Sequence, residues 1–126
     1  MHKKNVKILA PVSSGRTWLG KKIIKALGDK IGYCSIIDEI IFSDTYEYVV
    51  SAELREKFIY IFLGFTKIAP QDIADKKFTP EQQKTLLEES KKWKEFASKR
   101  NLQYFDVTKR DEQTYDDIVE WVKKQV

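Results

Sequence analysis

The chain has 126 residues, a net charge of +4, and 42% hydrophobic and 33% charged residues, which predict one globular domain over residues 1–126 rather than a disordered segment. No apolar run approaches the roughly 20 residues of a membrane span, and a single cysteine, Cys34, excludes an internal disulfide, so we expect a cytoplasmic protein without a membrane partner. No aromatic-and-glycine RNA motif or zinc-finger spacing accompanies the positive charge, which favours a solvated basic surface over a nucleic-acid partner.

The first part of the chain predicts a strand, a turn, a helix and a second strand. Residues 6–10 form a short apolar run, which is typical of a central strand covered on both faces. Residues 17–27 have apolar side chains at helical spacing, and Gly28 is a natural stop. Residues 33–42 are rich in β-branched and aromatic side chains and predict a strand over part of their length. The predicted buried face of the helix holds Leu19, Ile23, Ile24 and Leu27.

The rest of the chain continues the alternation. Residues 51–57 have helical character, residues 58–65 are the most apolar run and predict a buried central strand, and residues 66–78 predict a loop. A capping threonine, a proline and a glutamine predict a helix start at Thr79, and this helix should extend to about Lys99. A strand over 102–107 and a helix over 111–126 follow. The expected buried side chains of the two helices are Leu86, Trp93, Phe96, Ala97, Tyr115, Ile118, Val119 and Val122.

This alternation predicts an α/β fold with three α/β/α layers. Strands that alternate with helices form a mainly parallel sheet with helices on both faces, here with four to five strands.

The turn between the first strand and the first helix has the pattern of a variant phosphate-binding P-loop. Residues 10–17, APVSSGRT, match the Walker A spacing of Gly or Ala, four residues, Gly, Lys and Ser/Thr, except that Arg16 replaces the lysine. Ser13, Ser14 and Gly15 would present backbone N–H groups to a phosphate at the helix N-terminus. Thr17 would place its hydroxyl on Mg²⁺, and Arg16 would reach the β- and γ-phosphates.

With this loop, the chain resembles a small P-loop kinase of the nucleoside and nucleotide kinase class. Two further segments contribute to the resemblance: IFLGF at 61–65 and YFDVT at 104–108. The resemblance implies a sheet order of 2-3-1-4 and a loop at 108–110 beside the adenine base, which adds Arg110 to the nucleotide-binding residues. It also implies an acidic residue near the end of the second strand, for which Asp38 is our candidate, both as a catalytic group and, with Thr17, in placing Mg²⁺.

The lead hypothesis is therefore a protein that binds a nucleoside triphosphate or another phosphate ligand, with ATP-dependent phosphoryl transfer as its reaction if it is an enzyme. Two departures from the kinase pattern favour an alternative: Arg16 replaces the loop lysine, and residues 66–78 contain no arginine for a lid. The alternative is a catalytically degenerate P-loop fold that binds a protein partner as an inhibitor or adaptor, through residues 38–47 or 66–78. A third reading, a flavodoxin-like phosphate or flavin binder, shares the alternation and the hydroxyl-rich first loop.

Overall fold

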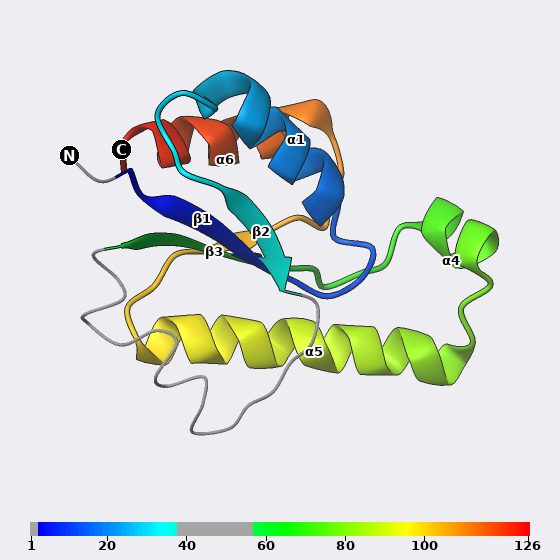
Figure 1. The fold of residues 1–126 in the computed structure, drawn as a ribbon. Coiled ribbons are helices and arrows are strands. Elements are labelled where there is room, and N and C mark those ends of the chain that lie inside the picture. Colours follow the sequence, from blue (N-terminus) through cyan, green and yellow to red (C-terminus); the bar gives the residue numbers. More distant parts are fainter. Residues whose placement is uncertain (1–2, 38–56) are drawn as a thin grey trace.

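The computed structural model describes residues 3–37 and 57–126, and all structural statements refer to these residues (Figure 1). Strands and helices alternate along the described chain with two exceptions: β3 is the next described element after β2, and α4 and α5 follow one another between β3 and β4. The elements are β1 (Asn5–Leu9), α1 (Arg16–Leu27), β2 (Cys34–Ile37), β3 (Phe58–Gly64), α4 (Pro70–Lys76), α5 (Pro80–Lys99), β4 (Tyr104–Asp106) and α6 (Glu112–Lys123).

The four described strands form one parallel sheet in the order β2-β1-β3-β4. Ile8 of β1 lies opposite Ile36 of β2 on one side and Ile61 of β3 on the other. The order 2-3-1-4 expected from the kinase resemblance is therefore wrong for these strands. The physical difference is that β2 pairs directly with β1, so that β1 lies between β2 and β3 rather than between β3 and β4.

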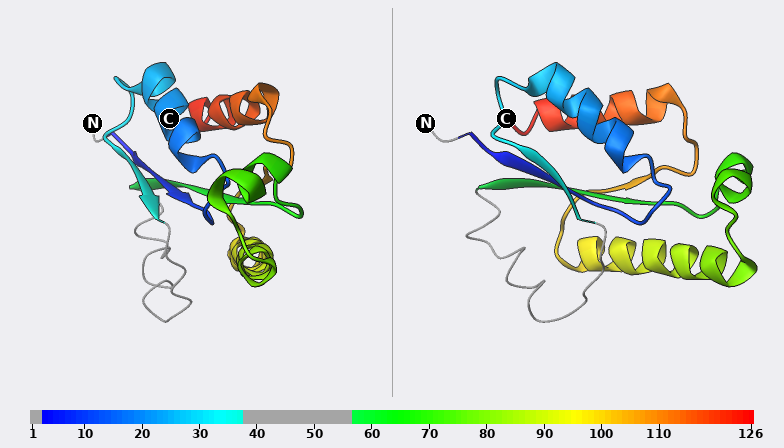
Figure 2. Two further views of the ribbon diagram at one scale, coloured as in Figure 1. Left: turned by 90° about the vertical axis from the view of Figure 1, so that its right-hand side faces the viewer. Right: turned by 45° about the vertical axis from the view of Figure 1, so that its right-hand side comes forward.

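The sheet separates two layers of helices, as the alternation predicted. Helices α1 and α6 lie together on one face and α5 covers the opposite face (Figures 1 and 2). A buried cluster on the α1/α6 side includes Ile8, Ile61 and Tyr115, and a second cluster includes Phe62, Trp93 and Phe96, where α5 packs on β3. The structure is thus a three-layer α/β/α arrangement.

The predicted burial of the central strand and of the two C-terminal helices is confirmed. In β3, every residue from Ile59 onward is buried, which explains why its sequence is apolar without alternation. Helix α5 begins with the predicted capping box, in which Thr79 Oγ1 accepts from Gln82 N at 3.1 Å and Gln82 Oε1 accepts from Thr79 N at 2.9 Å. All eight side chains predicted to be buried in α5 and α6 are buried.

Three sequence predictions require correction or fall outside the described residues. Residues 66–78 are not wholly a loop, because α4 forms a two-turn helix there; this helix buries no residue, so it lacks the apolar periodicity that reveals a helix. Ile24 is 53% exposed instead of buried, and Gly20 takes the inward position on α1. The predicted helical segment 51–57 and the strand beyond residue 37 lie largely outside the described ranges.

Among the described residues, none of the helices is both long and apolar enough to cross a membrane.

Candidate functional site

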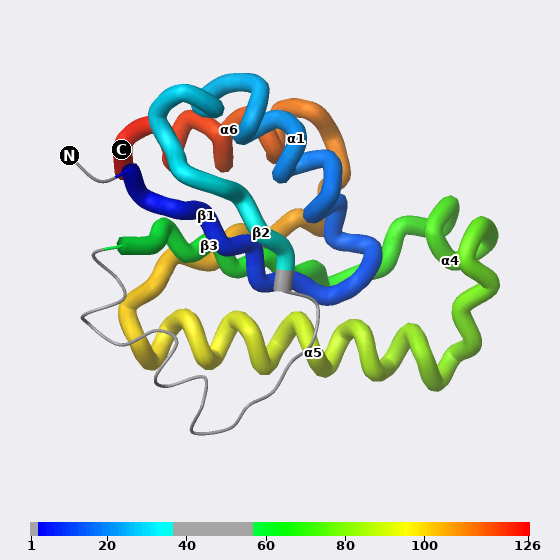
Figure 3. Tube along the Cα trace, in the orientation of Figure 1, coloured from blue at the N-terminus to red at the C-terminus, as the bar shows by residue number. Residues whose placement is uncertain are grey.

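The loop that carries the P-loop pattern lies at the carboxyl end of β1, at a point where the connections after two neighbouring strands lead to opposite faces of the sheet. The helix that follows β1 covers one face, whereas the helices that follow β3 lead to the other face. The tube in Figure 3 shows the turn after β1 and the segment after β3 leaving the sheet at the same end. In open α/β sheets, ligands bind in the crevice outside such a switch point.

The loop backbone has two left-handed residues next to the start of α1. Ser13 has φ 68° and Gly15 has φ 75°, and such alternation turns successive N–H groups toward one concave side. Gly15 is also the N-cap of the 12-residue α1, where no side chain caps the helix and no acidic residue lies in the first turn. The first-turn N–H groups therefore keep their capacity to bind an anion.

Glycine is required at position 15 for packing as well as for its φ angle. A Cβ there would overlap the hydroxyl of Tyr115 and would lie 2.7 Å from Tyr115 Cζ. The hydroxyl in turn donates a 2.7 Å hydrogen bond to the carbonyl oxygen of Ser14. Tyr115, from α6, therefore fixes the loop from behind, and burial raises the pKa of its hydroxyl.

The two predicted serines have different roles. Ser14 is fully buried, and its Oγ donates to the carbonyl oxygen of Pro11 at 2.8 Å, so the side chain stiffens the loop from within. Ser13 Oγ accepts a 2.9 Å hydrogen bond from the ammonium group of Lys76 in α4. Of the two serines, only Ser13 lines the cavity described next.

A cavity of about 270 Å³ opens at this loop, and three of its lining residues are cationic. The structure brings Arg110, from the turn before α6, and Lys76 to the same cavity as Arg16, and no acidic residue from the described ranges lines it. Arg110 also forms an ion pair with Asp72 of α4. The complete lining is Val12, Ser13, Gly15, Arg16, Thr17, Trp18, Lys76 and Arg110.

Arg16 lines the cavity but also contacts the loop itself. Its Nη1 donates to the carbonyl oxygen of Ala10 at 3.0 Å. Its charge also acts on Glu89 of α5, where burial raises the carboxyl pKa against the opposing effects of Lys92 and Arg16. Part of the guanidinium is thus engaged by protein groups and is not free to contact only a phosphate.

Of the two residues predicted to place Mg²⁺, Thr17 and Asp38, only Thr17 belongs to the part of the chain that the structure describes. Thr17 is exposed and lines the cavity, so its hydroxyl could supply one oxygen ligand to Mg²⁺. Asp38, the expected catalytic and metal-placing carboxylate, lies outside the described residues. Within residues 3–37 and 57–126, no three His, Cys, Asp or Glu side chains are grouped so that they could hold a metal ion by themselves.

Sequence reasoning missed Lys76 and Tyr115 as residues of the site. Neither belongs to the loop motif, and both come to it through tertiary contacts from α4 and α6. Trp18 is 42% exposed at the cavity and packs edge-on against Tyr115, with ring centres 4.9 Å apart. Trp18 directly follows Thr17 in the sequence, which is why its side chain lies at the cavity.

No family model matches the chain, and no curated protein matches its sequence.

Proposed function

We propose that the protein binds a phosphate-bearing ligand, in the first instance a nucleoside triphosphate, through residues 13–17. The observation that carries the proposal is the cationic cavity at the uncapped start of α1. Arg16, Lys76 and Arg110 supply positive charge there, and the turned backbone supplies N–H donors. Both features favour an anionic group with several acceptor oxygens.

The strand order supports the location of this site and leaves two kinds of ligand to compare. In the kinase order 2-3-1-4, strand 2 lies at the edge of the sheet. If that strand is left out and the other three are renumbered along the chain, their order is 2-1-3, which is the arrangement of β2, β1 and β3 here. The order β2-β1-β3-β4 is also that of the first four strands in the five-stranded flavodoxin-like order 2-1-3-4-5, and flavodoxin binds FMN at its β1/β3 switch point. FMN is therefore the second candidate ligand, and the strand order is the observation that favours it.

Phosphoryl transfer is the proposed reaction if a nucleoside triphosphate binds with Mg²⁺. The terminal phosphorus would form a bond to an acceptor oxygen as its bond to the diphosphate breaks, and the acceptor proton would pass to a base, for which Asp38 is our candidate. Thr17 would contact the metal ion, while Arg16, Lys76 and Arg110 would bind phosphate oxygens. The hydrogen bond from Arg16 to the carbonyl oxygen of Ala10 engages part of the guanidinium, and this observation supports the alternative of a degenerate, partner-binding protein.

Calorimetric titration tests the binding. ATP, GTP and FMN are each titrated into the full chain, the triphosphates with and without Mg²⁺. We expect saturable binding that Arg16→Ala weakens about tenfold, because a hydrogen bond to a charged group contributes about 1.5 kcal/mol or more. Lys21→Ala is the matched control, since Lys21 is an exposed cation on the same helix and does not line the cavity.

Two results decide between the readings. An absence of binding at millimolar concentrations of all three ligands would refute the proposal and leave the partner-binding alternative. If a triphosphate binds, turnover is measured next, and a gain in turnover with Arg16→Lys would show that the arginine limits catalysis.

A further inference from the structure

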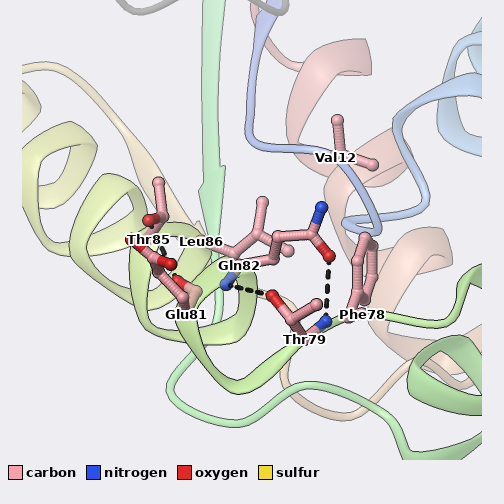
Figure 4. A pocket seen from close by; sticks show the side chains of 7 residues that line it. All are labelled: Val12, Phe78, Thr79, Glu81, Gln82, Thr85 and Leu86. Carbon is pink, nitrogen blue, oxygen red and sulfur yellow. Dashed lines mark hydrogen bonds between the residues drawn. The ribbon is translucent and has the colours of Figure 1, made fainter.

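A second and larger cavity adjoins the loop at Val12. It has a volume of about 530 Å³, within the range of small-molecule sites. Val12 is 38% exposed and lines both cavities, so the two share one wall. We call the larger one the Phe78 cavity; its lining is Val12, Phe78, Thr79, Glu81, Gln82, Thr85 and Leu86 (Figure 4).

Phe78 supplies the aromatic surface of this cavity; hydrogen bonds hold its backbone, and its side chain packs against the buried core. The backbone N–H of Phe78 donates to Ile73 O at 3.2 Å, and its carbonyl oxygen accepts from Gln83 Nε2 at 3.2 Å. Leu86 and Val12 provide further apolar surface in the cavity. An aromatic ring packed on the core, with aliphatic neighbours, favours a flat apolar-faced ligand.

The side-chain amide of Gln82 favours a ligand that has a hydrogen-bond acceptor on its edge. Gln82 Oε1 accepts from the backbone N–H of Thr79, which fixes which end of the amide is oxygen. The amide nitrogen consequently points away from Thr79, toward the side of the cavity where Val12 lies (Figure 4). Gln82 thus offers N–H donors to a ligand that presents an acceptor on its edge.

Lys76 connects the two cavities. Its ammonium nitrogen lies 2.9 Å from Ser13 Oγ in the loop and 5.9 Å from the centre of the Phe78 ring. A phosphate at the loop and a ring against Phe78 would therefore lie on either side of one cation.

We propose that the Phe78 cavity binds the flat nitrogen-containing ring of a nucleoside, with a ring acceptor facing Gln82 and the ring face against Phe78. The ring belongs either to the phosphate-bearing ligand itself or to a second molecule that receives the phosphoryl group. The proposal deepens the phosphate-binding function and rests on it for the position of the phosphate, whereas the ring site is testable without phosphate.

The test uses probes that separate the two cavities. Adenosine, guanosine, cytidine and uridine, which carry no phosphate, are titrated into the full chain by calorimetry, and inorganic tripolyphosphate is titrated separately. We expect at least one nucleoside to bind at a single site. If tripolyphosphate alone fails to bind, the loop function is refuted. If none of the four nucleosides binds when each is titrated to near its solubility limit, the ring site is refuted.

Two variants of the cavity make the test specific. Phe78→Leu should weaken nucleoside binding about fivefold or more, the lower end of what stacking of a base on an aromatic side chain contributes. Gln82→Glu keeps the oxygen that caps Thr79 and suits the capping box, so the fold should persist even if Phe78→Leu is unstable. It removes the N–H donor and should also weaken binding about fivefold.

Gln103→Glu is the control of equal charge change, at an exposed residue just before β4 that does not line the Phe78 cavity. Nucleoside binding that is unchanged or tighter in Gln82→Glu, or weakened equally by Gln103→Glu, would overturn the proposal. A final titration of nucleoside into the ATP-bound protein assigns the ring: competition identifies the ring of ATP itself, and simultaneous binding identifies a second molecule. Both results require an occupied Phe78 cavity.

Discussion

The loop conformation makes a quantitative prediction for Gly15→Ala. Alanine at φ 75° costs about 1–2 kcal/mol in the left-handed region. Its Cβ would also displace the Tyr115 hydroxyl and break the hydrogen bond to Ser14 O, a further loss of about 1 kcal/mol. We therefore expect the free energy of unfolding, measured by urea denaturation, to fall by about 2–3 kcal/mol, and phosphate affinity to fall with the altered loop.

Two comparisons separate these causes. Gly20→Ala, in the same helix, should be neutral or stabilising by up to about 1 kcal/mol, because its Cβ would meet Cys34 Sγ and Ile8 Cδ1 at an ordinary 3.8 Å. In a Tyr115→Phe background, which removes the hydroxyl, the cost of Gly15→Ala should shrink by about 1 kcal/mol. An equal cost in both backgrounds, or a total cost below about 0.5 kcal/mol, would refute the proposed role of Tyr115 behind the loop.

Three further predictions concern stability and binding. Ser90→Ala should lower the free energy of unfolding by about 1–3 kcal/mol in urea denaturation, because buried Ser90 Oγ accepts from Phe65 N at 3.2 Å and that N–H would lose its partner. Stability should fall as pH rises above 9: burial raises the pKa of Cys34 from 9.0 to about 11 and that of Tyr104 from 10.0 to about 12, so the unfolded chain loses these protons first. Denaturation across pH 8–11 checks this, and Tyr104→Phe should flatten the fall. Lys76→Ala should weaken tripolyphosphate binding about fivefold in low salt and less in 1 M salt, and an effect independent of salt would contradict its electrostatic origin.

The sequence predicted what depends on local patterns. Apolar periodicity located the buried faces of α5 and α6, and the threonine, proline and glutamine at 79–82 located the start of α5. Both features depend only on residues that are close together in the sequence. Helix α4 was missed because it buries no residue. Ile24 was misplaced because its position on the helix is inward only if neighbouring elements cover it, and they leave it 53% exposed.

The candidate site was predictable in its loop and not in its surroundings. The spacing of Gly15 and Thr17 identified the turn, and the kinase resemblance added Arg110, which does line the loop cavity. No local sequence pattern indicated the role of Lys76 or the presence of the Phe78 cavity. Both depend on contacts between residues 12–13 and residues more than 60 positions away along the chain. Asp38 stays a prediction, as it lies outside the described residues.

The strand order also determines how the two cavities are arranged. Because β1 lies beside β3 and their helices cover opposite faces, the start of α1 and the start of α5 open toward the same end of the sheet. The first helix start lines the cationic cavity and the second lines the Phe78 cavity, with Val12 between them. If another strand separated β1 from β3 by about 4.8 Å more, one ligand would have to span a wider gap to contact both. The adjacency of β1 and β3 therefore sets the two cavities side by side, as the proposed ligand, with a charged end and a flat ring, would require.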